Sequence, residues 1–275
     1  MALTIGDALR RMGGGGPAAI EARALMRHVL GCDDGYLIAH GNEALTPAQA
    51  EAFEALAARR GGGEPVAYLT GFREFFELEF EVTPAVLIPR PETERLVELV
   101  LERVLPGAAA RVLDLGAGSG CVAIAVARHR PRAQVLAADA ALDAVELARK
   151  NAERHGTPNV RVLRSDWFAA LAHERFDVIA ANPPYVAAGD PHLDAGDLRF
   201  EPRRALVAGP AGTECIAAIT AAAPAHLNPG GWLLFEHGPE QGSAARELLH
   251  AAGFTREINT WRDLAGLERV SGGQS

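Results

Sequence analysis

A short apolar run that leads directly into a glycine-rich turn constrains the fold of this chain more than any other segment. Val112-Leu113-Asp114-Leu115 predicts a buried strand, and Gly116-Ala117-Gly118-Ser119-Gly120 follows it without a break. Glycine lets the backbone pass close to a ligand because it carries no Cβ. The helix predicted from Cys121 begins with unpaired backbone N–H groups, which favour a polar ligand. Strand, glycine turn and helix in this order are typical of nucleotide-binding α/β folds.

Apolar runs and helix-length segments alternate from this point onward. Further strands are predicted at Gln134–Ala138, Val160–Arg164, Val178–Ala181 and Trp232–Glu236. Helices are predicted between them, for example at Cys121–Arg128 and Ala141–His155. Such alternation predicts an α/β fold with a parallel, doubly wound sheet of the Rossmann-like type.

The N-terminal part of the chain has a different, helical pattern. Apolar residues recur at helical spacing between Ile20 and Leu30, and Gly31 ends that helix. Thr46 and Pro47 are typical N-cap and first-turn residues of a second helix. We therefore predict a small helical domain over residues 1–70.

The segment between the helical and α/β parts predicts a strand. Phe76, Leu78, Phe80 and Val82 alternate with glutamates, which indicates a half-buried strand, part of a hairpin that joins two domains. The prolines that follow favour an extended linker. The expected organisation is a helical domain at 1–70, a β-hairpin and linker at 71–90, and the α/β domain at 91–275.

The glycine spacing and the residues at the next strand ends indicate an adenosyl cofactor. Pyrophosphate-binding loops use Gly-x-Gly-x-x-Gly, whereas the tighter Gly-x-Gly-x-Gly of Gly116–Gly120 suits a ligand without pyrophosphate, such as S-adenosylmethionine. Asp139 ends the second strand and can accept hydrogen bonds from both ribose hydroxyls. Asp166 can accept from the adenine amino group, and Trp167 can pack against the ring.

Each of these residues also has an ordinary structural explanation. The glycines alone would make a tight turn, Asp139 would cap the next helix, and Trp167 would be a core residue. Their occurrence at three successive strand ends favours the ligand, because ligands bind at the carboxyl ends of parallel strands.

Asn182-Pro183-Pro184-Tyr185 follows the fourth strand and is the candidate reacting site. The Asn182 side-chain oxygen and the Pro183 carbonyl are both acceptors, so together they can bind the two N–H protons of one planar NH₂ group. The two prolines make the turn stiff, and Tyr185 can cover the flat face of the bound group. A proline-rich turn without function is the alternative. Adenine, cytosine and glutamine all present such a group, so the motif leaves the substrate open.

Composition excludes several other classes. The net charge of −8 disfavours a nucleic-acid partner, since an acidic protein does not attract phosphate over long range. Cys32, Cys121 and Cys215 lie far apart without metal-ligand spacing, so we predict free thiols in a reducing cytosol and no metal. Neither a signal peptide nor an apolar run of membrane-spanning length is present, so we predict a cytoplasmic protein without a membrane partner.

Further motifs along nearly the whole chain carry a resemblance to a known family. They are Glu64–Gly71, Leu87–Glu94, Phe200–Arg203, Gly230–Trp232, Glu236–Gly238 and Asp263–Gly266. With these motifs the chain resembles the release factor glutamine methyltransferases, the HemK or PrmC family. Nucleic-acid amine methylases share the Asn182 motif, whereas Pro89–Glu94 is far more specific to this family.

The resemblance implies S-adenosylmethionine-dependent methylation of the side-chain amide nitrogen of the glutamine in the Gly-Gly-Gln motif of class I peptide chain release factors. It implies catalytic roles for Asn182, Pro183 and Tyr185, substrate contacts at Asn182–Tyr185, and cofactor contacts at Gly116–Gly120, Asp139, Trp167 and Asn182. The helical domain would hold the release factor, and we expect a monomer. The alternative is an adenine exocyclic-amine methyltransferase acting on DNA or RNA, which predicts a basic recognition region that is not evident.

The segment after Asp139 and the last four residues of the chain each lead to a further expectation. The family usually has Asp-Ile-Ser-Pro where this chain has Asp139-Ala140-Ala141-Leu142, so a helix-capping hydroxyl worth roughly 1 kcal/mol is absent. The chain also ends in Gly272-Gly273-Gln274-Ser275, which contains the substrate tripeptide of the family in a tail predicted to be flexible. We take this as coincidence, with self-methylation as the alternative hypothesis.

Overall fold

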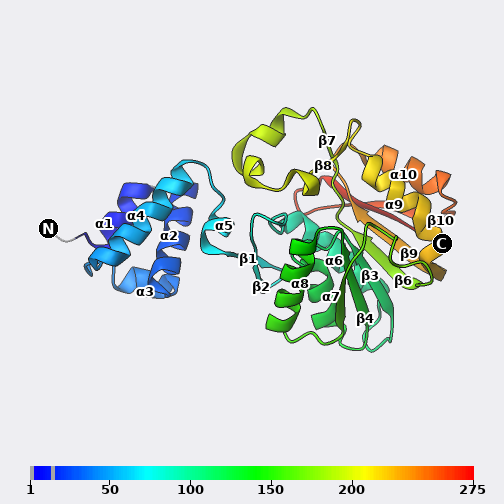
Figure 1. Cartoon of the computed structure of the whole chain (residues 1–275), viewed down its shortest axis with the longest axis horizontal. Helices are drawn as coiled ribbons and strands as arrows, with labels where there is room; N and C mark the ends of the chain where they lie inside the picture. Colours follow the sequence, from blue (N-terminus) through cyan, green and yellow to red (C-terminus); the bar gives the residue numbers. More distant parts are fainter. Residues whose placement is uncertain (1–2, 14–15) are drawn as a thin grey trace. The chain divides into compact units, whose positions relative to one another are not determined.

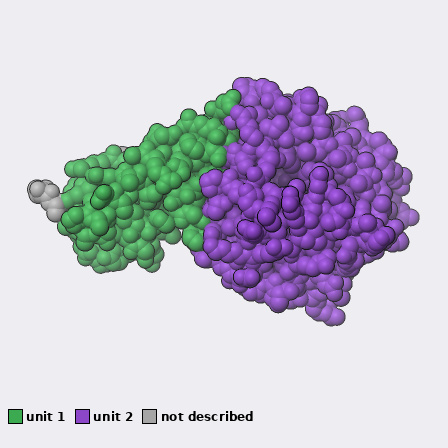
Figure 2. Space-filling model, viewed as in Figure 1, with its two compact units in different colours: residues 1–72, 194–200 green, residues 73–193, 201–275 purple. Residues whose placement is uncertain are grey.

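The computed structural model describes residues 3–13 and 16–275. The chain forms two compact units (Figure 2). The first comprises Met1–Phe72 and Asp194–Phe200, and the second comprises Arg73–Leu193 and Glu201–Ser275. The chain therefore returns to the first unit once, between Leu193 and Glu201.

The first unit is helical (Figure 1). Its helices are α1 Ile5–Met12, α2 Pro17–Leu30, α3 Asp34–Ala39, α4 Pro47–Gly61 and α5 Val66–Thr70, and the returning segment contains the 3₁₀ helix η3 Gly196–Phe200. Thr46 and Gln49 form a reciprocal capping box at the start of α4, which explains why this helix is predictable from the sequence. Leu25, Met26 and Phe53 are among the buried residues of the core of this unit.

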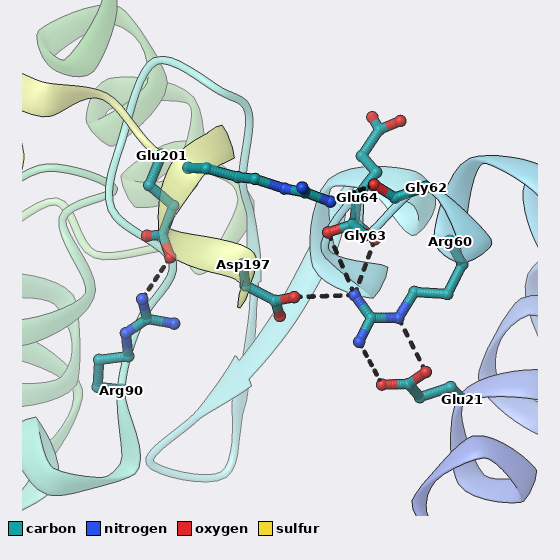
Figure 3. A network of polar contacts seen from close by, with 9 residues as sticks. Glu21, Arg60, Gly62, Gly63, Glu64, Arg90, Asp197 and Glu201 are labelled. Carbon is teal, nitrogen blue, oxygen red and sulfur yellow. Dashed lines mark hydrogen bonds and ion pairs between the residues drawn. The ribbon is translucent and has the colours of Figure 1, made fainter. Parts of the chain in front are cut away.

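Arg60 at the end of α4 holds the returning segment to the helices (Figure 3). Its guanidinium donates to both carboxylate oxygens of Glu21 at 2.8 and 2.7 Å and to Asp197 Oδ1 at 2.8 Å. The same group donates to the Glu64 carbonyl at 3.1 Å. A planar guanidinium suits this task because it can serve several acceptors in fixed directions. Arg60 thereby joins three stretches of chain that are distant in sequence.

A β-hairpin follows the helices, but its turn lies where the sequence predicted a strand. The strands are β1 Phe72–Phe75 and β2 Leu78–Glu81. Phe76 and Glu77 form the turn between them, with φ of 50° and 61°. Two positive φ angles fit the twist of a two-residue hairpin, although glycine and asparagine are the usual residues there. The predicted hairpin is present and Leu78 and Phe80 lie in its second strand, but that strand does not include Phe76, because the alternating pattern continues through the turn.

The second unit contains a seven-stranded sheet in the order β10-β11-β9-β6-β3-β4-β5. Its parallel strands are β3 Arg111–Leu115, β4 Gln134–Asp139, β5 Val160–Arg164, β6 Phe176–Ala181 and β9 Leu227–Glu236. The antiparallel edge consists of β10 Arg256–Arg262 and β11 Glu268–Gln274. The predicted parallel strands and the Rossmann-like fold class are confirmed, and the antiparallel edge is an addition.

Alternate residues of each parallel strand enter two different cores, as a doubly wound fold requires. Val178 and Ala180 of β6 lie in one core, and Ile179 and Ala181 lie in the other. The first core includes residues of α6 Glu94–Arg103, α7 Cys121–His129 and α8 Leu142–Arg154, and the second includes residues of α9 Glu214–Ala222 and α10 Gly242–Ala251. Shorter elements are η1 Pro91–Thr93, η2 Pro191–Asp194, η4 Arg203–Ala205, η5 Ala223–His226, β7 Val186–Ala187 and β8 Val207–Gly209.

The C-terminal Gly-Gly-Gln sequence is part of β11, so the prediction of a flexible tail was wrong. Gly272 and Gly273 are buried, and Gln274 Nε2 donates to the Gly230 carbonyl at 2.9 Å. A Cβ on Gly272 would lie only 2.4 Å from the Leu233 carbonyl oxygen. The glycines therefore serve close strand packing here, and self-methylation would require β11 to leave the sheet.

We expect Gly272→Ala to lower the free energy of unfolding by about 1–3 kcal/mol, the range for overpacking a tight interior site. Urea denaturation followed by circular dichroism measures this change. Gly189→Ala is the matched control, because a Cβ at Gly189 meets no atom within 4 Å. Equal unfolding midpoints for the two variants would contradict the packing role.

Candidate active site

A cavity of about 230 Å³ lies at the carboxyl ends of β3, β4 and β6 in the second unit. The structure brings most of the predicted site residues to its wall: Gly116, Ala117, Gly118, Ser119, Asp139, Asp166, Trp167, Asn182 and Pro184. Gly120, Pro183 and Tyr185 were also predicted but are not part of the cavity lining. The position is the one at which parallel α/β sheets bind ligands.

The glycine loop turns tightly over the end of β4. Gly116 N–H donates to the Ala138 carbonyl at 2.8 Å, and the positive φ of Gly116 and Gly118, 71° and 54°, requires a conformation that favours glycine. Gly118 N–H donates to Asp139 Oδ2 at 2.9 Å, so one carboxylate fixes the loop. Gly120 has a packing role instead, because a Cβ there would lie 3.1 Å from the Ala148 Cβ on α8.

Asp139 is held in a fixed orientation at the end of β4. Its Oδ1 accepts from Ala141 N–H at 2.9 Å, while Oδ2 accepts from Gly118. Each carboxylate oxygen has a second lone-pair direction, which leaves room for further donors. The carboxylate faces the cavity and can therefore accept hydrogen bonds from a diol as well as position the loop.

Asp166 and Trp167 form the cavity wall beyond β5. Trp167 adopts a left-handed conformation with φ of 44°, which is uncommon for a bulky residue. The hydroxyl of Ser165 donates to the Trp167 carbonyl at 2.7 Å and accepts from Ala170 N–H at 3.1 Å, which holds this turn. Strained residues that the surrounding structure holds in place occur preferentially at ligand sites.

Asp114 is a cavity residue that the sequence analysis did not select as part of the site. It is buried, and its Oδ2 accepts from Ala123 N–H in α7 at 3.0 Å. Burial raises the pKa of the Asp114 carboxyl to about 7, although the Ala123 hydrogen bond lowers it. The signal available in the sequence was an acidic residue inside an otherwise apolar strand.

Asn182 is oriented by one hydrogen bond and keeps its oxygen free. Its Nδ2 donates to Thr93 Oγ1 at 3.1 Å. Its Oδ1 is buried and has no hydrogen-bond partner among the described residues. A buried acceptor without a donor costs free energy unless a ligand supplies one. Since Asn182 lines the cavity, this oxygen is suited to accept an N–H from a bound substrate.

Tyr185 and Thr93 both donate to one buried carboxylate, that of Glu236 at the end of β9. The distances are 3.0 Å from the Tyr185 hydroxyl to Oε1 and 2.7 Å from the Thr93 hydroxyl to Oε2. Burial and the adjacent Glu236 raise the pKa of the Tyr185 hydroxyl, so it remains a donor. Sequence reasoning missed both Thr93 and Glu236 as site residues, although each lies in a motif that the resemblance singled out.

A second buried carboxylate holds the opposite wall of the cavity. The Arg90 guanidinium is paired with Glu201, and Ile88 N–H donates to Glu201 Oε2 at 3.0 Å (Figure 3). The Glu201 side chain has an exposed fraction of 0%. The motifs at Leu87–Glu94 and Phe200–Arg203 are thus joined by this carboxylate, and Arg90 itself lines the cavity.

Two kinds of site are not found in the part of the chain that the structure describes. Residues 3–13 and 16–275 contain no group of three or more histidine, cysteine, aspartate or glutamate side chains that could hold a metal ion. Over the same residues, no helix has both the length and the apolar character needed to cross a membrane.

Comparison with known proteins matches both parts of the chain. Residues 7–71 match the PrmC N-terminal domain, and residues 93–201 match the methyltransferase small domain. Two curated proteins, each named "Release factor glutamine methyltransferase", are similar over nearly their whole length. The one from Xylella fastidiosa is 49% identical over 93% of this chain and 92% of its own. The one from Bordetella pertussis is 51% identical over 92% of this chain and 94% of its own.

Among solved structures, a 16S rRNA methyltransferase from T. thermophilus in complex with AdoMet and guanosine is similar in fold. It has a TM-score of 0.54 and 25% identity, and the match covers 74% of this chain and 49% of that chain. The sheet described above is therefore that of an AdoMet-binding methyltransferase fold.

We expect Asp139→Asn to weaken cofactor binding by roughly ten- to hundredfold, because hydrogen bonds to a charged group contribute about 1.5–3 kcal/mol. Titration calorimetry with S-adenosylhomocysteine measures the affinity directly. Glu146→Gln, an exposed carboxylate change on α8, is the control. Wild-type affinity in Asp139→Asn would exclude the proposed contact.

Proposed function

This chain belongs to the release factor glutamine methyltransferase family, and we propose that it transfers a methyl group from S-adenosylmethionine to the side-chain amide nitrogen of a release factor glutamine. The finer assignment is the glutamine of the Gly-Gly-Gln motif in class I peptide chain release factors. The observation that carries the chemistry, transfer to a planar NH₂ group, is the free Oδ1 of Asn182, an acceptor fixed beside the cavity. The choice of glutamine among such groups is supported by the family.

The described residues fit the cofactor. The glycine loop leaves room for the cofactor to lie against its backbone, and the Asp139 carboxylate would accept from the ribose hydroxyls. Asp166 would accept from the adenine amino group, and Trp167 would pack against the ring. When bound, S-adenosylmethionine supplies an electrophilic methyl group on its sulfonium. The cavity then needs only to place a nitrogen beside that methyl group.

The Asn182 turn places the nitrogen. The amide nitrogen of glutamine is a poor nucleophile because its lone pair is delocalised into the carbonyl. Asn182 Oδ1, in the cavity wall, is proposed to accept one of its two N–H protons, and the Pro183 carbonyl, outside the cavity lining, to accept the other as the substrate enters. Both bonds oppose delocalisation and direct the lone pair toward the methyl group. Such positioning can contribute up to roughly 7–11 kcal/mol. The amide proton is lost after transfer, so the chain needs no dedicated base.

The helical unit is proposed to hold the release factor. Ile20 on α2 and Ile38 on α3 are large apolar side chains with exposed fractions of 73% and 74%, which suits contact with a protein partner. The net charge of −8 supports a protein rather than a nucleic-acid substrate. A substrate that acts in translation supports the proposal of a cytoplasmic enzyme.

Methyl transfer to purified release factors tests the assignment. We expect incorporation of labelled methyl from S-adenosylmethionine into a class I release factor, and none into the same factor with its Gly-Gly-Gln glutamine changed to alanine. Mass spectrometry of the tryptic peptide locates the added mass. Transfer to DNA or RNA, with none to the release factor, would instead support the adenine-amine alternative.

We expect Asn182→Ala to reduce turnover by roughly 10²–10³-fold, the usual effect of removing one preorganised hydrogen-bond partner of a reacting group. Cofactor affinity should fall by less than about tenfold, since the change removes at most one neutral hydrogen bond to it. Asn259→Ala, an exposed change on β10, serves as the control. Wild-type turnover in Asn182→Ala would refute the mechanism.

A further inference from the structure

We propose that Glu236 and Thr93 set the direction of the hydrogen bonds around the Asn182 amide, and that they thereby act as positioning residues for methyl transfer. The inference rests on the proposed amide methylation. It assigns a role to two motifs that lie outside the Asn182 turn, one at the end of η1 and one at the end of β9.

Three side chains form a continuous hydrogen-bonded chain that leads to the substrate position. Asn182 Nδ2 donates to Thr93 Oγ1 at 3.1 Å, and the Thr93 hydroxyl donates to Glu236 Oε2 at 2.7 Å. Thr93 and Glu236 have exposed fractions of only 2% and 1%. Because they are buried, water cannot readily replace either partner.

The direction of these bonds follows from the number of protons available. An ionised carboxylate can only accept, so the single hydroxyl proton of Thr93 is committed to Glu236. Thr93 Oγ1 then presents only lone pairs to Asn182, and only the NH₂ end of the Asn182 amide can face it. The oxygen end is therefore directed away from Thr93, where it remains without a partner in the described structure.

The opposite arrangement would be unproductive. If Thr93 donated its proton to Asn182, the amide would turn and present its NH₂ group to the substrate. Two NH₂ groups would then face each other, and the substrate nitrogen would lose the acceptor that fixes it. The role of Glu236 is to exclude this arrangement by acting as the acceptor for Thr93.

Both oxygens of Glu236 accept a hydrogen bond from a hydroxyl group while the carboxyl is ionised. Tyr185 donates to Oε1 while Thr93 donates to Oε2. The other charged or titratable groups acting on it are Arg269 on β11, which favours the carboxylate, and Glu92 in η1, which disfavours it. Cys121 on α7 is also within electrostatic range, and its pKa is itself raised by burial.

These surroundings make the arrangement sensitive to pH. Burial raises the pKa of Glu236 to about 7, against the lowering effect of its two hydroxyl donors. A raised pKa means that the carboxylate is present above that value and is protonated as the pH falls through it. A protonated Glu236 can donate to Thr93 and so reverse the chain, and methyl transfer should decline toward acid pH.

The first test is Thr93→Val, which removes the hydroxyl with little change in shape. We expect the single-turnover rate of methyl transfer to a release factor to fall ten- to hundredfold, while affinity for S-adenosylhomocysteine changes by less than about threefold. Thr93→Ser restores the hydroxyl and should recover most of the lost rate. Thr220→Val removes a buried hydroxyl that donates to the Ile216 carbonyl within α9, and it is the matched control.

The second test is Glu236→Gln, which keeps the shape but places an NH₂ donor in the network. The rate at pH 8 should fall, and the decline of the wild-type rate between about pH 8 and 6 should become shallower, because Glu236 no longer titrates in this range whereas Asp114 still does. This pH profile separates positioning from a purely structural role, which would lower the rate equally at all pH values.

The results distinguish failure of the proposed methyl transfer from failure of the positioning role of Thr93 and Glu236. A wild-type enzyme that methylates no release factor overturns the proposed function itself. A wild-type enzyme that is active, with a Thr93→Val variant of equal rate, overturns only the positioning role. A parallel loss of cofactor affinity and rate in Thr93→Val, without recovery in Thr93→Ser, also overturns it, because the side chain would then be supporting the fold.

Discussion

The register between β3 and β6 is the constraint on which the rest of the site depends. Leu115 is paired with Ala181, so the residues that follow, Gly116 and Asn182, leave the sheet side by side. A parallel ladder allows no slip of one residue here, because a slip would exchange the two buried faces of the strand. Backbone hydrogen bonds therefore set the glycine loop and the Asn182 turn against each other, before any side chain of the proposed site contributes.

Buried carboxylates then fix the loops that surround this edge. Glu201 accepts from the backbone and side chain of the Leu87–Arg90 wall, and Glu236 accepts from Thr93 and Tyr185. A buried charge costs several kcal/mol unless it is well hydrogen-bonded, so each carboxylate is useful only with its full set of donors. The cost is offset by donors from segments distant in sequence, and this is how one side chain can hold a loop in place.

Strands and motifs formed by consecutive residues could be predicted from the sequence. The parallel strands are largely apolar on both faces, and the glycine loop and Asn182 turn are short and unbroken, so all were found. The turn at Phe76–Glu77 was missed because it lacks the glycine or asparagine that marks such turns. The strand β11 was missed because its glycines resemble a tail. Thr93 and Glu236 were missed as a pair because their contact joins positions 143 residues apart, and local patterns carry no information on such contacts.

The contrast between local sequence patterns and contacts of distant residues also applies to the Asn-Pro-Pro-Tyr turn. The turn is proposed to supply two acceptors, of which Asn182 Oδ1 lines the cavity. An asparagine amide, however, is nearly symmetrical in shape and can present either end. The amide presents its oxygen to the substrate only if the residue that contacts its other end can accept, but not donate, a hydrogen bond. In this chain that residue is Thr93, whose hydroxyl proton is donated to Glu236 and is therefore not available to Asn182. Glu236 lies at the end of β9, outside the turn.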